Sequence, residues 1–297
     1  MARVLLINPS MDMAAGFGDY KALSEAMPPT GLAYVAGAAR RHGHDVRMID
    51  DFVENRGDEG LLQFIGAYEP DVIGIPVLTP VAQGIEQFCS RLRRERPGAK
   101  IVFGNLHASV FAEEMVERGI CDVVVHGEGE ERFPSVVDGL TSESDFSSLP
   151  GITWKPNGAA KTTGPAPQIR ELDTLARPAW DLLPWSHYTF LPFVTVARPC
   201  LAVLGSRGCP YRCTYCVEGD ADNRLRVRKP GRSPTRSSGL SAITARGTSA
   251  SSIRFFRSIR STGWRCARPF ASAGFPATGG GPLKHVSTSS TRKSAAP

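Results

Sequence analysis

The sequence has 297 residues, 41% hydrophobic and 22% charged, a length that suits two modest domains or one domain with an extension. No uncharged apolar run approaches the roughly 20 residues that span a bilayer, and no signal-peptide core is recognisable, so we expect a cytoplasmic protein. All 29 acidic residues lie at or before Asp222, against 20 basic residues, which gives that part a net charge of −9. Residues 223–297 carry 15 basic residues and no acid, a bias that usually indicates a nucleic-acid partner.

Residues 1–140 alternate short apolar segments with amphipathic ones. We predict strands at 4–7, 45–49, 71–75, 100–103 and 122–125. Between strands, apolar residues recur at helical spacing, as in Val81, Ile85, Phe88 and Leu92. Nearly continuous apolar strands indicate burial on both faces, which is typical of parallel sheets. The sequence therefore predicts a doubly wound α/β sheet as a first domain over residues 1–140.

The chain changes character after this domain. Residues 141–200 are rich in Ser, Pro and Asp, and we predict a linker that contains a small β-element at 152–154. A new apolar strand at 201–204 then leads directly into a loop that begins at Cys209. We predict that residues 201–230 start a second domain.

Three cysteines, Cys209, Cys213 and Cys216, lie on that loop at x3 and x2 spacing. Clustered thiolates suit iron–sulfur clusters and zinc. Three ligands on one loop can hold three irons of a [4Fe–4S] cluster and leave the fourth iron open to a small molecule. One alternative is a closed zinc or iron site completed by Cys200 or Cys266, and another is three surface thiols without a metal.

The segment Ser206-Arg207-Gly208-Cys209, followed by Cys213 and Cys216 with an aromatic before the last cysteine, resembles the radical S-adenosylmethionine (SAM) enzymes. The resemblance implies that the three cysteines ligate the cluster and that its open iron binds SAM. It places Tyr215 near the adenine of SAM. It also implies reductive cleavage of SAM to a substrate-activating radical, and an electron donor such as flavodoxin or ferredoxin.

Ligands of a doubly wound sheet bind beyond the carboxyl ends of its strands. The loops expected there span residues 8–10, 76–80, 104–107 and 126–130, and they are rich in Gly, Pro and small polar residues. The dinucleotide fingerprint Gly-x-Gly-x-x-Gly is absent after the first strand, which argues against a nicotinamide cofactor.

These loops resemble the cobalamin-binding domain that precedes the radical SAM core in one large subfamily. The matching segments are Pro29–Tyr34, Gly104-x-x-His107, Gly127–Glu130, Leu172-Asp173 and Pro178–Asp181, and the resemblance covers roughly residues 1–220. It implies cobalamin contacts at Ser10, Thr79, Gly104, Asn105, His107, Gly127, Glu128 and Gly129. The family often has two glycines where this chain has Gly104-Asn105, and the motif that donates a lower His ligand elsewhere is missing. We therefore expect base-off cobalamin without a protein histidine on cobalt.

Two of these assignments have structural alternatives of equal weight. His107 at a strand end also suits a loop-packing role. Glu128 and Glu130 precede or open a predicted helix, where carboxylates favour the helix dipole.

The final segment conflicts with the resemblance. A radical SAM barrel needs many alternating strands and helices, since a full barrel takes about 250 residues, but residues 231–297 lack periodicity, acids and the Gly-Gly-Glu segment that the family uses for SAM. We predict an incomplete barrel followed by a basic, disordered or out-of-frame tail, with a frameshift near residue 230 as the leading hypothesis. A genuine basic tail and a degenerate relative are the alternatives.

The resemblance predicts a cobalamin-dependent radical SAM enzyme that transfers a methyl group to an unactivated carbon of a small biosynthetic intermediate, with the chain itself potentially inactive. The alternatives are a non-catalytic cobalamin-binding module and a radical SAM cyclase or rearrangement enzyme. Nucleic-acid binding by the tail is disfavoured because few aromatic residues are available there for stacking.

Overall fold

The computed structural model describes residues 1–10, 27–188, 200–209, 211, 213–216, 224–229, 254–257 and 265–266. Its main element is a seven-stranded sheet in the order β2-β1-β3-β4-β5-β6-β7. The strands are β1 (Arg3–Asn8), β2 (Asp45–Asp50), β3 (Val72–Pro76), β4 (Lys100–Gly104), β5 (Val123–Val125), β6 (Ile152–Trp154) and β7 (Lys161–Thr162). β1 to β5 pair in parallel, as predicted, and the order reverses between β1 and β3.

Helices cover both faces of this sheet, and the doubly wound prediction is confirmed. They are α2 (Thr30–Arg41), α3 (Asp51–Glu54), α4 (Gly57–Tyr68), η2 (Thr79–Val81), α5 (Ala82–Glu95), α6 (Asn105–Val110), α7 (Ala112–Glu117) and α8 (Gly129–Ser142). Leu6 belongs to the core that α2 and α8 cover, whereas its neighbour Leu5 belongs to the core under α4, α5 and α7. Successive side chains of β1 therefore enter opposite apolar layers, which explains the unbroken apolar strand.

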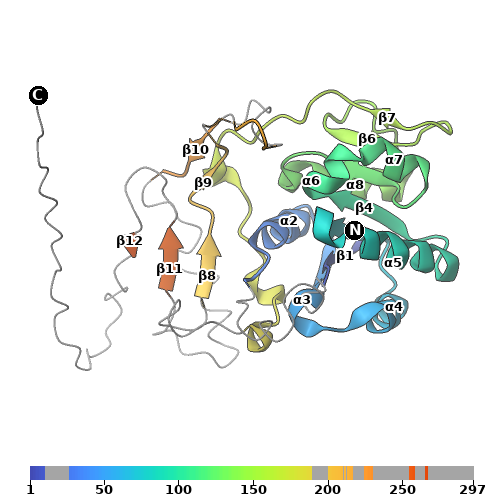
Figure 1. Ribbon diagram of the computed structural model, residues 1–297, viewed down its shortest axis with the longest axis horizontal. Helices are drawn as coiled ribbons and strands as arrows, with labels where there is room; N and C mark the ends of the chain where they lie inside the picture. The colour runs from blue at the N-terminus through green and yellow to red at the C-terminus, as the bar shows by residue number, and fades with distance from the viewer. Residues whose placement is uncertain are drawn as a thin grey trace, which may run out of the picture. The chain divides into compact units, whose positions relative to one another are not determined.

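The small β-element expected between residues 141 and 200 is an extension of the sheet. β6 pairs antiparallel with β5, and β7 pairs antiparallel with β6, so the sheet continues past the predicted end of the first domain (Figure 1). The following segment contains three short turns, η3 (Leu172–Thr174), η4 (Trp180–Leu182) and η5 (Trp185–His187).

The segment around η4 covers α2. The Ala179 amide donates to the Ala33 carbonyl at 2.8 Å, and Arg40 pairs with Asp181 at 2.8 Å. Gly37 permits this approach, since a methyl group at position 37 would lie only 1.9 Å from the Arg177 carbonyl oxygen.

The remaining strands are short. β8 (Cys200–Val203) confirms the strand predicted near 201–204, and β9 (Ser206–Arg207) pairs antiparallel with β10 (Arg226–Val227). β11 (Arg254–Arg257) runs parallel to β8, and β12 (Arg265–Cys266) pairs with β11. The rest of 231–297, to which the tail prediction refers, lies outside the described residues. Within the described part, no helix is long and apolar enough to cross a membrane.

Candidate functional site: a cleft between the sheet and the cysteine loop

A cleft of about 1430 Å³ lies at the carboxyl ends of the parallel strands. The sheet contributes Asn8, Pro76, Gly104 and Val125, each at or next to the end of a different strand. The opposite wall includes Arg207 and Gly208, which immediately precede Cys209 in the chain. Pockets for drug-sized ligands occupy about 300–1,000 Å³, so this cleft suits a larger ligand.

Three predicted glycines, Gly104, Gly127 and Gly129, line the cleft. A methyl group at Gly104 would meet only the Val125 carbonyl oxygen, at 3.7 Å, so the backbone there is open to a ligand such as the broad, flat ring system of a cobalamin. Gly127 has a φ of +67°, a backbone conformation that L side chains rarely adopt, and a methyl group there would lie 3.2 Å from the Ala166 side chain. Gly129 opens α8, and a methyl group there would lie 3.3 Å from the Val35 side chain.

Asn105 occupies the position where the resembled family often has a second glycine. Its φ is +75°, in the left-handed region that Asn tolerates better than most residues, and its side-chain oxygen accepts a hydrogen bond from the Leu106 amide at 2.8 Å. The substitution of Asn for Gly therefore keeps the backbone conformation and adds an amide to the cleft wall.

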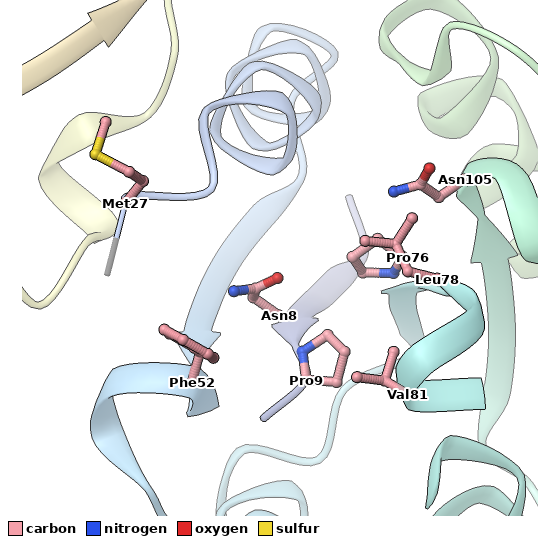
Figure 2. Close-up of a pocket in the computed structure, with 8 residues that line it drawn as sticks. All are labelled: Asn8, Pro9, Met27, Phe52, Pro76, Leu78, Val81 and Asn105. Atoms are coloured by element: carbon pink, nitrogen blue, oxygen red, sulfur yellow. The ribbon is translucent and has the colours of Figure 1, made fainter. Parts of the chain in front are cut away.

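A smaller pocket of about 260 Å³ adjoins the cleft and shares Asn8, Pro76 and Asn105 with it. Figure 2 shows its lining, in which Asn8 at the end of β1 and the following Pro9 lie between Phe52 on one side and Pro76, Leu78 and Val81 on the other. The pocket lies where the strand order reverses between β1 and β3, which is where doubly wound sheets bind their ligands.

Three predicted contacts are not among the residues that line the cleft. Ser10 is exposed beyond β1, and Thr79 is exposed in η2. Thr79 Oγ1 lies 3.1 Å from Nδ1 of His107, whose ring lies 4.7 Å from that of Phe111. The observed contacts of His107 therefore join η2 to α6.

Glu128 lines the cleft, but its carboxylate is also the centre of an ion-pair group. It accepts hydrogen bonds from the Ile169 amide at 2.7 Å and from Arg226 at 2.9 Å, and it lies 3.5 Å from Arg207. Burial raises the pKa of Glu128, but these donors and the nearby guanidinium charges outweigh it and bring the pKa below its ordinary value. Glu128 is also the N-cap residue of α8 and Glu130 lies in its first turn, where a helix dipole favours carboxylates, although Glu128 makes no side-chain cap hydrogen bond.

The cysteine loop is more open than the cleft. Cys209 and Cys213 are half-buried, Cys216 is exposed, and Tyr215 is 90% exposed. The Cys216 amide donates to the Cys213 carbonyl at 3.0 Å, so these two residues share a turn. Among the described residues, no three Cys, His, Asp or Glu side chains are arranged to hold a metal ion.

The donor set nevertheless suits a cluster, because three thiols that form no disulfide lie together on one accessible loop. By contrast, Cys89 and Cys121 are buried, and burial raises the pKa of the Cys89 thiol to about 12, which disfavours the thiolate that a metal needs.

Sequence reasoning missed three arginines beside the cysteine loop, of which Arg207 and Arg226 line the cleft. Arg207, Arg226 and Arg228 contact carboxylates that lie 55 to 98 residues away in the chain. Arg207 belongs to the Ser206-Arg207-Gly208-Cys209 segment that carries the resemblance, but the sequence does not indicate which carboxylates pair with its side chain.

Comparison with known proteins identifies the first domain. Residues 22–137 match the model of the B12 binding domain. An uncharacterized methyltransferase of Pyrococcus horikoshii is 29% identical over 215 residues, covering 72% of this chain and 45% of that protein. The anaerobic magnesium-protoporphyrin IX monomethyl ester cyclase of Cereibacter sphaeroides is 28% identical over 214 residues, covering 70% and 34%.

Solved structures share the fold. The radical SAM methyltransferase TsrM from Kitasatospora setae, solved with tryptophan and a SAM analogue, superposes with a TM-score of 0.58 at 19% identity, covering 82% of this chain and 44% of TsrM. The same enzyme has been solved with cobalamin and a [4Fe–4S] cluster bound. The chain is therefore similar to the B12 binding domain over residues 22–137 and, over more of its length, to a methyltransferase and a cyclase. The chain spans less than half the length of the two curated relatives compared above.

Proposed function

We propose that the chain binds cobalamin in the cleft and a [4Fe–4S] cluster at Cys209, Cys213 and Cys216, as the cofactor half of a methyltransferase that acts on an unactivated carbon of a small molecule. One observation carries the proposal. A single cleft has the glycine loops of the B12 binding domain on one side and the residues just before Cys209 on the other. Both cofactor sites would therefore face the same enclosed volume.

The chain's own residues have distinct tasks in this proposal. The backbone at Gly104, Gly127 and Gly129 admits a flat ring close to the sheet, and Asn105 adds a polar contact at its edge. The cluster, when bound with SAM, supplies an electron for radical formation and cobalamin carries the methyl group. The thiols hold the cluster, Tyr215 is a candidate contact for the adenine of SAM, and the cleft walls orient the reactants and exclude water.

The test is anaerobic purification, reconstitution with iron and sulfide, titration with hydroxocobalamin, and incubation with SAM and dithionite as the electron source. We expect brown iron–sulfur absorbance, stoichiometric cobalamin and release of 5′-deoxyadenosine from SAM. Cys213→Ala should lose the cluster and the cleavage of SAM but keep cobalamin binding. Substitution of the buried Cys89 by Ala is the matched control, and it should keep the cluster, the cleavage of SAM and cobalamin binding. A Cys213→Ala protein with a full cluster, or a colourless zinc protein, would remove the assignment.

Two other functions share this site. A cyclase is favoured by the similarity to the Cereibacter sphaeroides enzyme, and it would cleave SAM without transferring a deuterated methyl group from labelled SAM to product. A non-catalytic cobalamin module would bind hydroxocobalamin but assemble no cluster.

A further inference from the structure

Three arginines lie at the two ends of the cysteine loop. In the β9–β10 pair, Arg207 is in register with Arg226, and Cys209, Cys213 and Cys216 lie between the two strands in the chain. We call residues 204–229 the cysteine hairpin. Two guanidinium groups at one register position repel each other, so the hairpin needs nearby carboxylates to hold its strands together.

The first domain supplies those carboxylates from a single segment. Arg207 pairs with Glu130, and the two side chains are only 13% and 5% exposed. Arg226 donates to Glu128 at 2.9 Å and to the Ile169 carbonyl at 2.8 Å. Burial lowers the pKa of Arg207, but the hydrogen bond and charge of Glu130 raise it above its ordinary value overall.

Arg228 makes a third attachment beside Tyr34. Its guanidinium donates to the Leu204 carbonyl at 2.9 Å, lies 3.4 Å from Asp173 and lies 3.3 Å from the Tyr34 hydroxyl. The Tyr34 ring is fully buried, with Arg207 at 5.6 Å and Arg228 at 5.8 Å from its centre. Cations over an aromatic ring are attracted by its electron-rich face.

Glu128 and Glu130 alternate with Gly127 and Gly129, which line the cleft. The same four-residue segment therefore forms part of the cleft wall and holds both strands of the cysteine hairpin. Buried ion pairs contribute little net stability, but their directional geometry fixes how two elements sit against each other.

We propose that Arg207, Arg226 and Arg228, together with Glu128, Glu130 and Asp173, form an arginine latch that sets the position of the cysteine loop relative to the cleft. Arg226 is a positioning residue, since it acts through Glu128 and the hairpin. The inference rests on the proposed function for its catalytic meaning, because a displaced loop would move the cluster away from the cobalamin.

The first test is hydrogen–deuterium exchange on the full chain without cofactors. In Arg226→Gln we expect backbone amides of residues 204–209 and 224–229 to exchange about tenfold faster or more, while those of β1 to β4 keep their rates. Arg118→Gln is the matched control, because Arg118 pairs with Glu86 and Glu114 on the far more exposed surface of α5 and α7, and it should leave the hairpin unchanged. Unchanged hairpin exchange in both Arg226→Gln and Glu130→Gln overturns the latch.

The second test separates positioning from mere stability. In the reconstituted chain, the reduced cluster should broaden the electron paramagnetic resonance signal of cob(II)alamin, and Arg226→Gln should remove this broadening while iron content and hydroxocobalamin affinity stay within twofold. Arg226→Lys, which keeps a charged donor, should restore it. Broadening that persists in Arg226→Gln overturns the positioning role. A wild-type chain that assembles no cofactor defeats the proposed function instead, and the exchange experiment still decides the latch.

Discussion

The first region, residues 1–10 and 27–188, and the described part of the cysteine hairpin are held together by different interactions. In the first region, strand residues such as Leu5 and Leu6 are almost completely buried between helices on both faces of the sheet. Among the described residues of the hairpin, the apolar Leu225 and Val227 are 43% and 51% exposed, whereas the charged Arg228 is buried, with 6% exposed.

This contrast means that the stability of the sheet and the position of the cysteine loop depend on different interactions. Apolar burial contributes about 25 cal/mol per Å² without directional preference, so it stabilises the sheet whatever happens at the hairpin. Charged hydrogen bonds contribute less but are directional, so they can set where the cysteine loop lies. Single substitutions should therefore unfold the first region or displace the hairpin, and seldom do both.

The largest expected effect comes from the core. Phe103→Ala removes a side chain that is 1% exposed beneath α5 and α7 and should lower the free energy of unfolding by about 3–5 kcal/mol. Urea denaturation measures this change. Phe111→Ala is the matched control, because its ring is 44% exposed, and a loss as large as that of Phe103→Ala would mean that the two apolar layers do not carry the stability.

Gly37→Ala sharpens the comparison at the contact between α2 and the segment around η4. Its new methyl group would clash with the Arg177 carbonyl, so we expect a loss of about 1–3 kcal/mol in urea denaturation. Gly31→Ala lies in the same helix with no atom within 4 Å of the added methyl, and it should be neutral or stabilising. Equal effects of the two substitutions would contradict the close approach.

Tyr188→Phe tests a polar attachment within the first region. The Tyr188 hydroxyl donates to Asp50 at 2.5 Å, and Asn8 donates to the same carboxylate at 2.7 Å. Asp50 is fully buried, and burial raises its pKa above the ordinary value. Loss of one donor should cost about 1–3 kcal/mol at neutral pH.

The sign of the pH dependence follows from that raised pKa. Stability linked to Asp50 is fully present below its unfolded pKa and is lost as the pH rises through the higher folded value. The deficit of Tyr188→Phe should therefore shrink in acid, where the carboxyl is neutral. A deficit that grows as the pH falls would show that Asp50 is not the group involved.

The fold of the first region was predictable because the strands β1, β3, β4 and β5 carry apolar runs that are buried on both faces. The antiparallel attachment of β6 and β7 was not, since three- and two-residue strands leave no period to detect. The six-residue helices α6 and α7 are too short for helical spacing to stand out.

The candidate site was predictable where glycine carries the signal. Gly104, Gly127 and Gly129 all line the cleft, where Gly104 leaves the backbone open, Gly127 adopts a positive φ, and Gly129 makes room for the Val35 side chain. His107 was predicted to contact cobalamin from the segment Gly104-x-x-His107, but its observed side-chain contacts are to Thr79 and Phe111. The arginine partners of Glu128 depend on tertiary pairing, which no local pattern encodes.

The smallest expected effect is the acid response of the arginine latch, which should run opposite to that of Asp50. Arg207 and Arg226 face Glu128, Glu130 lies beside it, and the net pKa of Glu128 is below its ordinary value. Stability from a carboxylate with a lowered pKa is present above its unfolded pKa, about 4.3, and is lost as the pH falls through the folded value.

We therefore expect amide protection in residues 224–229, corrected for intrinsic exchange, to fall severalfold below that pH. Glu128→Gln should have weaker protection at neutral pH and a flatter acid response, because the titrating group is gone. If Glu128→Gln keeps the wild-type acid response, a different carboxylate holds the hairpin.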